Sequence, residues 1–466
     1  MSIKTQLTVL PVIIFLSGLN TLFAEPTFTN ENKTEVIKTL SEAINTGYVL
    51  VEEGNKISQE LMSLHDAGEF NNKTTKDEFV QQLNQKLFQI SNDKHLSLRP
   101  EGGGAGRRMV RRAAPNAASS TQAQGQTSAA GPQKVRKVPA QKNQSMKKMM
   151  GLPDTPSIET KILPGNVGLL KVNDLMGTVA GADKAMAELA NTDGLIIDVR
   201  QCPGGLGDIS NQISSYFVPE GEEIMKMHTR GQDVRINRSV VLPAGAKRYL
   251  GKPFYLATSG FTGSACEALS FSLKYHDLGI VYGETTAGAG HASVNGLVAV
   301  GHKLAAFVPD SMPEHPKFKG GFEKVGVTAD IETGSLIAVD QAYQMILSQL
   351  LEKNPQDKPL SKAMFKVTKQ IQHALLQQVR DSREYAELVG QYSKQDAILL
   401  EKGQLKFQFS SGRKYPLVKL ADDLFKLVYS RGDAKLRINR DANKNVIDIS
   451  VSLSSGPKKW KNEQKI

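Results

Sequence analysis

The chain has 466 residues, of which 40% are hydrophobic and 23% charged, and its formal net charge is +11. This length allows about three domains, and the apolar content is sufficient for a sizeable buried core. Two cysteines cannot build a disulfide framework, and no stretch beyond residue 24 reaches the roughly 18 apolar residues of a membrane-spanning helix.

Residues 1–24 have the pattern of a secretory signal. Lys4 supplies a positive start, and Leu7–Leu19 is an apolar run too short to span a bilayer. Cleavage after Ala24 would release the mature chain, and no cysteine follows that could carry a lipid anchor. The sequence therefore predicts a soluble, exported protein, periplasmic or secreted, with its signal peptide removed.

Residues 30–98 are predicted to form an N-terminal helical domain. Apolar positions recur there at helical spacing, and Thr75 and Glu78 form a capping box at the start of one helix. Asp93-Lys-His95 follows that helix, where the pattern changes to a short strand. A histidine at such a junction is usually a polar loop residue, so spacing alone gives His95 little support as a catalytic group.

Residues 101–152 are predicted to be a disordered basic linker. Between 101 and 150 there are ten Lys or Arg residues and one acid, Glu101, which is a charge of +9 and leaves +2 for the rest of the chain. Basic, low-complexity sequence buries too little apolar area to offset the entropy of ordering. A solvated tether is the favoured interpretation, and an anionic partner such as envelope lipid or nucleic acid is the alternative. No specific nucleic-acid motif accompanies it.

Residues 155–352 alternate strands and helices, which predicts an α/β core. Leu195–Val199 is apolar enough for a central strand buried on both faces. It runs into a glycine-containing turn with Gly204 and Gly205, followed by a helix. No Gly-Lys-Ser/Thr element is present, so a nucleotide site is disfavoured. The same turn could direct free N–H groups at an oxyanion.

A second strand–turn–helix–strand unit extends from Pro253 to His291. Ser264 lies on its turn, at the start of the helix, where N–H groups and the helix dipole favour negative charge. Ser264 and Glu267 also fit a capping box, in which serine only caps the helix. Taken alone, this turn favours the cap over a nucleophile.

The part of the chain after His291 predicts further strands, a glycine-rich loop at 318–331, and helices at 336–351 and 358–380. From about Leu399 the apolar period becomes two, and residues 385–455 are predicted to form a small, barrel-like antiparallel β domain without catalytic groups.

Six segments, in this order, resemble the motifs of one known family: Asp93-Lys-His95-Leu96; Ile162–Gly168; Asp198-Val-Arg200 with Gly204-Gly205; Ser264-Ala-Cys-Glu267; Gly283–Thr286; and Phe322-Glu323 with Gly326-Val327 and Asp330-Ile331. Together they resemble the tail-specific (carboxyl-terminal processing) serine protease superfamily, in its branch similar to interphotoreceptor retinoid-binding protein and the tricorn protease core. The resemblance covers about 35–100 and 155–350. It implies a mixed α/β fold with a ClpP/crotonase-like protease core, and the tail resembles an accessory β domain appended to exported hydrolases.

The resemblance also implies a mechanism. Many relatives use a lysine base 25 residues after the serine, but that position here is Ala289. The tricorn-like branch instead uses serine, histidine and glutamate, so the resemblance assigns Ser264 as nucleophile, His95 as general base and Glu323 as the orienting group. A histidine base predicts activity that rises through roughly pH 6 to 8. His291 is the rival base.

Backbone N–H groups of Gly204 or Gly205, together with that of Ala265, would form the oxyanion hole. Cys202 and Cys266 lie beside motifs that should converge, yet free, buried thiols are favoured over a bridge.

The predicted function is an exported serine endopeptidase acting on protein or peptide substrates, without a cofactor or metal. A non-catalytic binding protein for apolar ligands or peptides is the alternative. A zinc hydrolase is disfavoured, because His291, His302 and His315 lack a recognised ligand spacing. The substrate and the oligomeric state are not indicated by the sequence.

Overall fold

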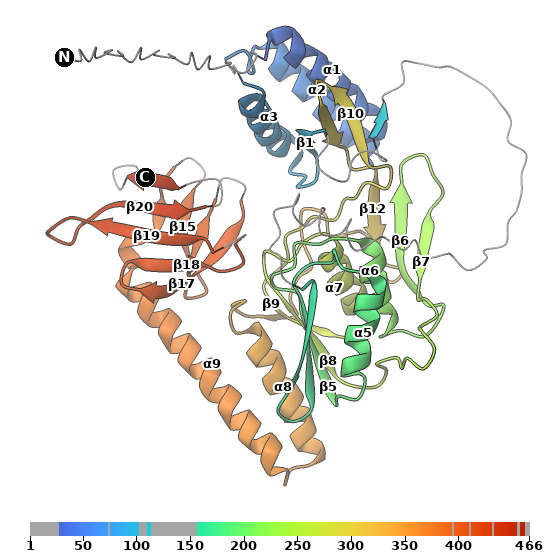
Figure 1. Cartoon of the computed structure of the whole chain (residues 1–466), viewed down its shortest axis with the longest axis vertical. Helices are drawn as coiled ribbons and strands as arrows, with labels where there is room; N and C mark the ends of the chain where they lie inside the picture. Colours follow the sequence, from blue (N-terminus) through green and yellow to red (C-terminus); the bar gives the residue numbers. More distant parts are fainter. Residues whose placement is uncertain are drawn as a thin grey trace, which may run out of the picture.

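The structure is a computed structural model that describes residues 28–72, 75–101, 110–112, 156–393, 396–409, 412–430, 433–453 and 457–461 (Figure 1). The expected signal peptide at 1–24 lies outside these residues, as does most of the expected linker. Among the described residues, no helix is both long and apolar enough to cross a membrane.

Three helices form the N-terminal layer: α1 (Asn30–Gly47), α2 (Val51–Asp66) and α3 (Lys76–Ser91). Capping boxes begin α1 at Thr29 and α3 at Thr75, as the sequence predicts for α3. The helices bury their apolar faces against a four-stranded sheet in the order β1-β11-β10-β2. Its members are β1 (Ser97–Pro100), β11 (Leu304–Phe307), β10 (Leu297–Gly301) and β2 (Val110–Arg112).

This sheet joins distant parts of the sequence. The β10–β11 hairpin contributes Val300, Leu304 and Ala306 to the core of the N-terminal helices. Strand β2 lies within the segment expected to have no fixed structure, and it pairs in parallel with β10. For Val110–Arg112, the edge of β10 offers backbone partners that composition does not reveal, and the linker otherwise stays a prediction.

The central sheet has six strands in the order β13-β9-β8-β5-β4-β3. Their bounds are β3 (Ile158–Leu163), β4 (Val167–Val172), β5 (Gly194–Asp198), β8 (Phe254–Thr258), β9 (Ile280–Gly283) and β13 (Ile331–Glu332). All neighbouring pairs are parallel except β3 with β4. Strands β5 and β8 are buried along their whole length, as their apolar sequences predict.

Helices cover both faces of this sheet. One face carries α5 (Val179–Leu189), α6 (Gly207–Ser215) and α7 (Ala265–Tyr275), and the other carries α8 (Ala338–Lys353) and the first part of α9 (Lys358–Glu384). A smaller antiparallel sheet, β12-β6-β7, lies beside them and consists of β6 (Glu223–Thr229), β7 (Arg235–Arg238) and β12 (Ser311–Glu314).

The C-terminal part is an eight-stranded antiparallel sheet whose strands follow one another in chain order. Helix α9 runs from the core to this sheet (Figure 1). The 3₁₀ turn η2 (Ala386–Leu388) lies between α9 and the first strand of the sheet. The strands are β14 (Gly390–Gln391), β15 (Ala397–Glu401), β16 (Gln404–Gln408), β17 (Lys414–Ala421), β18 (Leu424–Leu427), β19 (Lys435–Arg440), β20 (Val446–Ser452) and β21 (Lys458–Lys461). The antiparallel meander predicted from period-two alternation is therefore present.

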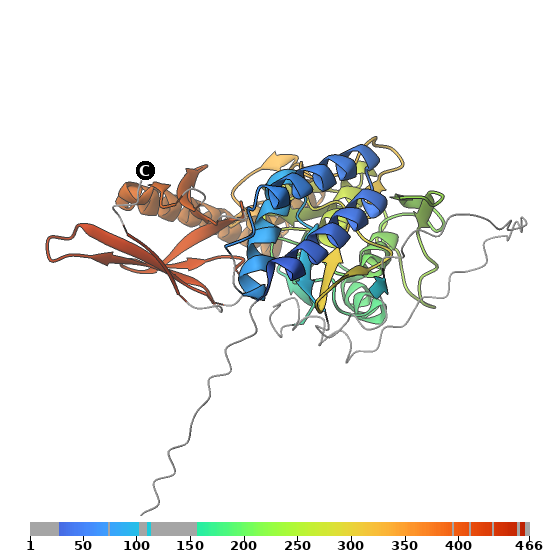
Figure 2. The ribbon, with the colours of Figure 1, turned by 90° about the horizontal axis from the view of Figure 1, so that it is seen from above.

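Seen from above, α1 to α3 lie over the core, and the C-terminal sheet extends to one side (Figure 2). The fold is thus the predicted mixture: an N-terminal helical layer, an α/β core and a C-terminal antiparallel sheet. Because β5 and β8 are parallel neighbours, the turns at their carboxyl ends meet. Those two turns position the candidate site.

Candidate active site

Ser264 occupies a strained backbone position at the start of α7. Its φ of 50° and ψ of −121° differ from the extended conformation that N-cap residues typically adopt. A positive φ is uncommon outside glycine and often marks a functional turn. Thr29 and Thr75, which cap α1 and α3, have ordinary extended angles. The conformation of Ser264 therefore favours more than a capping role.

Hydrogen bonds connect the Ser264 turn to the turn that follows β5. The Thr262 hydroxyl donates to the Val199 carbonyl at 2.9 Å, and the Gly263 N–H donates to the Cys202 carbonyl at 2.9 Å. The Ser259 hydroxyl donates to the carbonyl of Arg200 at 2.6 Å. The two turns consequently behave as one rigid unit.

A disulfide also joins these turns, because Cys202 is bonded to Cys266. The expectation of free, buried thiols was therefore wrong. The motifs beside them were expected to converge, and the parallel pairing of β5 with β8 brings the two Cα atoms to 6.1 Å. Both cysteines are fully buried.

Gly204 and Gly205 occupy backbone conformations that other residues rarely adopt, with φ of 117° and 147°. A Cβ on Gly204 would lie 2.6 Å from the Ser264 Cβ and 3.2 Å from the Ala265 nitrogen. A Cβ on Gly205 would lie 2.4 Å from the Leu175 carbonyl. The predicted oxyanion residues are thus brought together. The Ala265 N–H belongs to the first helical turn, whose donors have no intrahelical partner.

Glu267 connects the Ser264 turn to the loop after β9. Its carboxylate accepts the Ser264 N–H at 2.8 Å, the Gly288 N–H at 2.6 Å and the Ala289 N–H at 2.9 Å. The Thr286 hydroxyl donates to it at 2.6 Å. Burial raises the pKa of Glu267 to about 7, against the opposing effect of these hydrogen bonds. Glu267 holds the loop in place, which extends the capping role expected from the sequence.

His95 lies in the short loop between α3 and β1. The backbone N–H of His95 donates to the Asp93 carboxylate at 2.8 Å. The centre of its imidazole ring lies 5.7 Å from the centre of the Phe307 ring. Among the described residues, its Nδ1 atom is buried without a hydrogen-bond partner. Burial lowers the pKa of His95 to about 4, opposed by Asp93 and reinforced by Arg99, His291 and Arg413. A pKa lowered in this way keeps the imidazole neutral at physiological pH.

His291 forms a separate buried pair with Asp93. Its Nδ1 lies 2.8 Å from Asp93 Oδ2, and the Tyr48 hydroxyl donates to the same oxygen at 2.8 Å. Burial opposes ionisation of Asp93, but the hydrogen bond and charge of His291 prevail and lower the carboxyl pKa to about 2. Burial and the neighbouring Asp93 raise the pKa of Tyr48. Asp93 thus orders the loops of both histidines, a role that the Asp93-Lys-His95 motif alone does not indicate.

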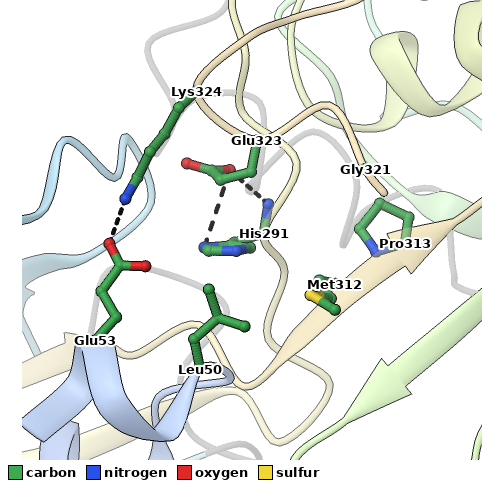
Figure 3. A pocket seen from close by; sticks show the side chains of 8 residues that line it. All are labelled: Leu50, Glu53, His291, Met312, Pro313, Gly321, Glu323 and Lys324. Atoms are coloured by element: carbon green, nitrogen blue, oxygen red, sulfur yellow. Dashed lines mark hydrogen bonds and ion pairs between the residues drawn. The ribbon is translucent and has the colours of Figure 1, made fainter. Parts of the chain in front are cut away.

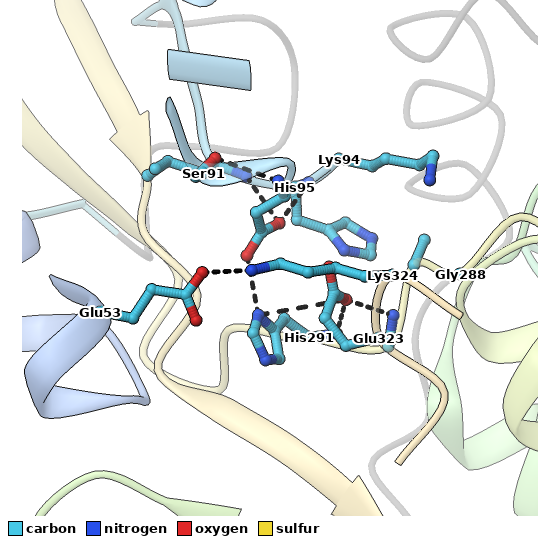
Figure 4. A network of polar contacts seen from close by, with 12 residues as sticks. Glu53, Ser91, Lys94, His95, Gly288, His291, Glu323 and Lys324 are labelled. Atoms are coloured by element: carbon cyan, nitrogen blue, oxygen red, sulfur yellow. Dashed lines mark hydrogen bonds and ion pairs between the residues drawn. The ribbon is translucent and has the colours of Figure 1, made fainter. Parts of the chain in front are cut away.

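Glu323 lies on the glycine-rich loop predicted to carry it. Its Oε2 accepts the Gly290 N–H at 2.6 Å and the His291 N–H at 2.8 Å, and lies 4.0 Å from His291 Nδ1. Its Oε1 is buried without a hydrogen-bond partner among the described residues. Burial and the Asp93 charge raise the pKa of Glu323. His95, His291 and Glu323 belong to one polar network with Lys94 and Lys324 (Figure 4).

A pocket of about 210 Å³ opens beside His291 and Glu323 (Figure 3). Its other lining residues combine an apolar wall with the Lys324–Glu53 ion pair: Leu50, Glu53, Met312, Pro313, Gly321 and Lys324.

Asp93, His291 and Glu323 are also the one group in the described part of the chain with metal-ligand spacing, since their ligand atoms lie within 4.8 Å of one another. Asp93 Oδ2 and Glu323 Oε2 each accept two hydrogen bonds from protein groups. These atoms therefore have partners without an ion.

The structure brings together most of the predicted site residues. Gly204, Ala265 and Ser264 form one cluster, while His95, His291 and Glu323 form a second. The loop from Gly288 to His291 connects the two clusters through Glu267 and Glu323. In the part of the chain that the structure describes, no hydrogen bond joins the Ser264 hydroxyl to either imidazole.

The α/β core thus combines a serine on a strained turn, glycines beside it and a histidine–carboxylate network. The sequence profile "Peptidase family S41" matches residues 166–333. The profile "N-terminal domain of Peptidase_S41 in eukaryotic IRBP" matches residues 29–130. The matched part of the core, residues 166–333, is thus similar to peptidase family S41.

Curated relatives match a shorter stretch. Proteins described as "Probable CtpA-like serine protease" from Staphylococcus aureus are 26% identical over 129 residues, which is 27% of this chain and 25% of theirs. A counterpart from Staphylococcus epidermidis is 28% identical over 129 residues. The chain thus matches about a quarter of the length of these relatives.

Two solved structures show the extent of the structural similarity. The photosystem II D1 C-terminal processing protease is 16% identical, with a TM-score of 0.41, over 66% of this chain and 94% of that one. Mature CPAF is 11% identical, with a TM-score of 0.41, over 70% of this chain and 98% of that one.

Proposed function

We propose that this protein is a serine endopeptidase of the tail-specific type, with Ser264 as nucleophile. The observation that carries the proposal is the strained backbone of Ser264 packed against Gly204 and the Ala265 nitrogen. A tetrahedral intermediate formed on Ser264 would place its oxyanion near the N–H groups of Gly204 or Gly205 and of Ala265. Such preorganised donors stabilise developing negative charge.

His95 acts as the general base in this proposal. Its pKa is lowered, so it is neutral and ready to accept the Ser264 proton at neutral pH. Arg413, which acts electrostatically on His95, lies over Phe261 on the Ser264 turn, and this favours His95 as the histidine on the nucleophile side. The acyl-enzyme formed by loss of the leaving amine would then be hydrolysed by water activated by the same base.

Glu323 orients His95 through its free carboxylate oxygen. The unpartnered Oε1 of Glu323 and the unpartnered Nδ1 of His95 are complementary, because a carboxylate can fix the tautomer in which Nδ1 carries the proton. Substrate binding would bring these groups to hydrogen-bonding distance, since catalytic hydrogen bonds often tighten only in the complex. His291 has a different role, because its Nδ1 is already engaged by Asp93.

Export is the second part of the proposal. The signal-like sequence of Met1–Ala24 supports it, and so does the Cys202–Cys266 disulfide, because disulfides persist in oxidising compartments. Fractionation of the native host combined with N-terminal sequencing tests this part. A mature chain that begins near Glu25 in an extracytoplasmic fraction is expected, and an intact Met1 in the cytoplasm would refute it.

The peptidase itself is tested with an unstructured peptide and a serine-directed phosphonate. The wild-type protein should cleave the peptide and be labelled on Ser264. Ser264→Ala should lose labelling and lower kcat on the order of 10⁶-fold. A folded wild-type protein that neither cleaves peptides nor reacts with the probe would support the binding-protein alternative, with Ser264 acting as a helix cap.

A further inference from the structure

The C-terminal sheet extends a hairpin over the Ser264 turn. Arg413, just before β17, and Tyr415, on β17, lie against Phe261, which precedes Ser264 by three residues. The Arg413 guanidinium lies 5.7 Å from the centre of the Phe261 ring, and the Tyr415 ring lies 6.3 Å from it. The sequence predicted no contribution of this domain to the site.

Specific polar contacts attach this hairpin to the core. Lys406 forms an ion pair with Glu284 at 2.7 Å, and the two side chains are only 9% and 16% exposed. The other oxygen of Glu284 accepts the Gly260 N–H at 3.2 Å, beside Phe261. After β18 of the same sheet, the Tyr429 hydroxyl donates to the Ser335 carbonyl. Buried ionic contacts of this kind define the position of the hairpin, because a displaced partner would remain uncompensated.

A second arginine, Arg99, lies near His95. Arg99 on β1 has its guanidinium 5.3 Å from the centre of the Phe307 ring, and the centre of the His95 ring lies 5.7 Å from the same ring in a tilted arrangement. The positive charges of Arg99 and Arg413 both act on the His95 imidazole. The histidine therefore lies within the influence of two cations that come from different domains.

Both arginines are available to a ligand. Arg200, Arg238, Arg248 and Arg440 each pair with a carboxylate, whereas among the described residues no acid pairs with Arg99 or Arg413. Arg99 donates one hydrogen bond to the Ser97 hydroxyl, and Arg413 is partly exposed. A guanidinium over an aromatic ring keeps its in-plane N–H groups free for a carboxylate.

We propose that Arg413 and Arg99 form a carboxylate-binding subsite beside the catalytic histidine, so that the enzyme prefers peptides with an acidic group near the cleaved bond. This inference rests on the proposed peptidase function and specifies its substrate class. The carboxylate could be a Glu or Asp side chain or the free C-terminus of the peptide. Arg413 determines specificity and does not take part in bond cleavage.

Four matched peptides measure the preference: one sequence with Glu or Gln beside the cleaved bond, each with a free or amidated C-terminus. Wild-type kcat/KM should be roughly tenfold higher for one carboxylate-bearing peptide than for its neutral match. The Glu/Gln pair and the acid/amide pair distinguish the two sources of the carboxylate. Equal kcat/KM for all four peptides would overturn the proposal.

Arg413→Gln should abolish most of this preference. Arg437→Gln is the control, because Arg437 is an exposed arginine of the same domain. Removal of the Arg413 charge should also raise the pKa of His95 and shift the acid limb of kcat/KM to higher pH. A preference unchanged in Arg413→Gln, or lost equally in both variants, would overturn the proposal.

A binding measurement separates this proposal from the peptidase function. The Ser264→Ala variant should bind a fluorescent acidic peptide more tightly than the matched neutral peptide. Adding Arg413→Gln to Ser264→Ala should remove this difference in affinity. If the wild type cleaves nothing, the peptidase proposal fails. The binding preference still decides the subsite, and its absence would reject the subsite independently.

Discussion

The two halves of the candidate site are held by different kinds of interaction. The nucleophile half, around Ser264 and Gly204, is fixed by a disulfide, by backbone hydrogen bonds and by the absence of Cβ atoms. The base half, around His95 and Glu323, is held mainly by contacts of ionisable groups from three distant segments. The first half should therefore respond to pH mainly through Glu267, whereas the second should respond through several ionisable groups.

The two halves should therefore be sensitive to different changes, one mainly to altered geometry and the other to altered protonation. Where backbone constraints hold a catalytic group, the enzyme loses activity when an added side chain displaces that group. Where charges hold it, the enzyme loses activity when a proton is added or removed. The following experiments test the comparison, beginning with the largest expected effect.

Replacement of the two histidines should distinguish their roles. His95→Ala should lower kcat/KM on the order of 10²–10⁴-fold, because it removes the base. His291→Ala should cost less, because its Nδ1 is occupied by Asp93 and it acts through the surrounding loops. Both variants are assayed on one unstructured peptide after circular dichroism confirms folding. Near-wild-type activity of His95→Ala together with an inactive His291→Ala would reverse the assignment.

Gly204→Ala should damage the nucleophile half without removing any catalytic atom. The new Cβ would meet the Ser264 Cβ at 2.6 Å, so the turn must shift. We expect kcat to fall on the order of 10²–10³-fold, as for loss of one oxyanion donor. Gly207→Ala is the matched control, because a Cβ there meets nothing within 4 Å. Equal kcat values for the two variants would argue against the oxyanion role of this turn.

The disulfide should contribute more to stability than to the chemistry. Cys202→Ala/Cys266→Ala removes a link between residues 64 positions apart, which should lower the free energy of unfolding by about 2–4 kcal/mol. Activity of the folded variant should fall less than tenfold, because backbone hydrogen bonds still join the turns. Guanidinium unfolding under oxidising and reducing conditions measures the change. A wild-type protein unaffected by reduction would show that the bond is dispensable.

The base half should determine the pH dependence. The pKa of His95 is lowered from 6.5 to about 4, so the imidazole stays neutral and activity should persist from pH 7 to about pH 5 before falling near pH 4. Acidification should also reduce stability between about pH 6.5 and 4, because the unfolded state then binds a proton that the folded state does not.

Glu267 should have the opposite effect on stability. Its pKa is raised to about 7 from 4.5, so its contribution is greatest below pH 4.5 and is lost as pH rises to about 7. Profiles of kcat/KM and of unfolding against pH, for the wild type and Arg413→Gln, test these expectations. An acid limb of kcat/KM that remains near pH 6.5 would contradict the lowered pKa of His95.

The fold was largely accessible from the sequence. The apolar run of Leu195–Val199 predicted a buried strand, and alternation after Leu399 predicted the antiparallel sheet. The glycines at 204 and 205 were recognisable because few turns need two adjacent residues without Cβ atoms. These features are local, since each depends on residues within a few positions of one another.

The connections across the site depended on tertiary structure. The disulfide, the Asp93–His291 pair and the position of Arg413 over Phe261 join residues separated by 64, 198 and more than 150 positions. Periodicity carries no information about such contacts, because chain folding and strand order create them. Sequence by itself determined which residue types were available at each turn. Only the tertiary structure decided which of them meet, and burial there lowered the pKa of His95 and raised that of Glu267.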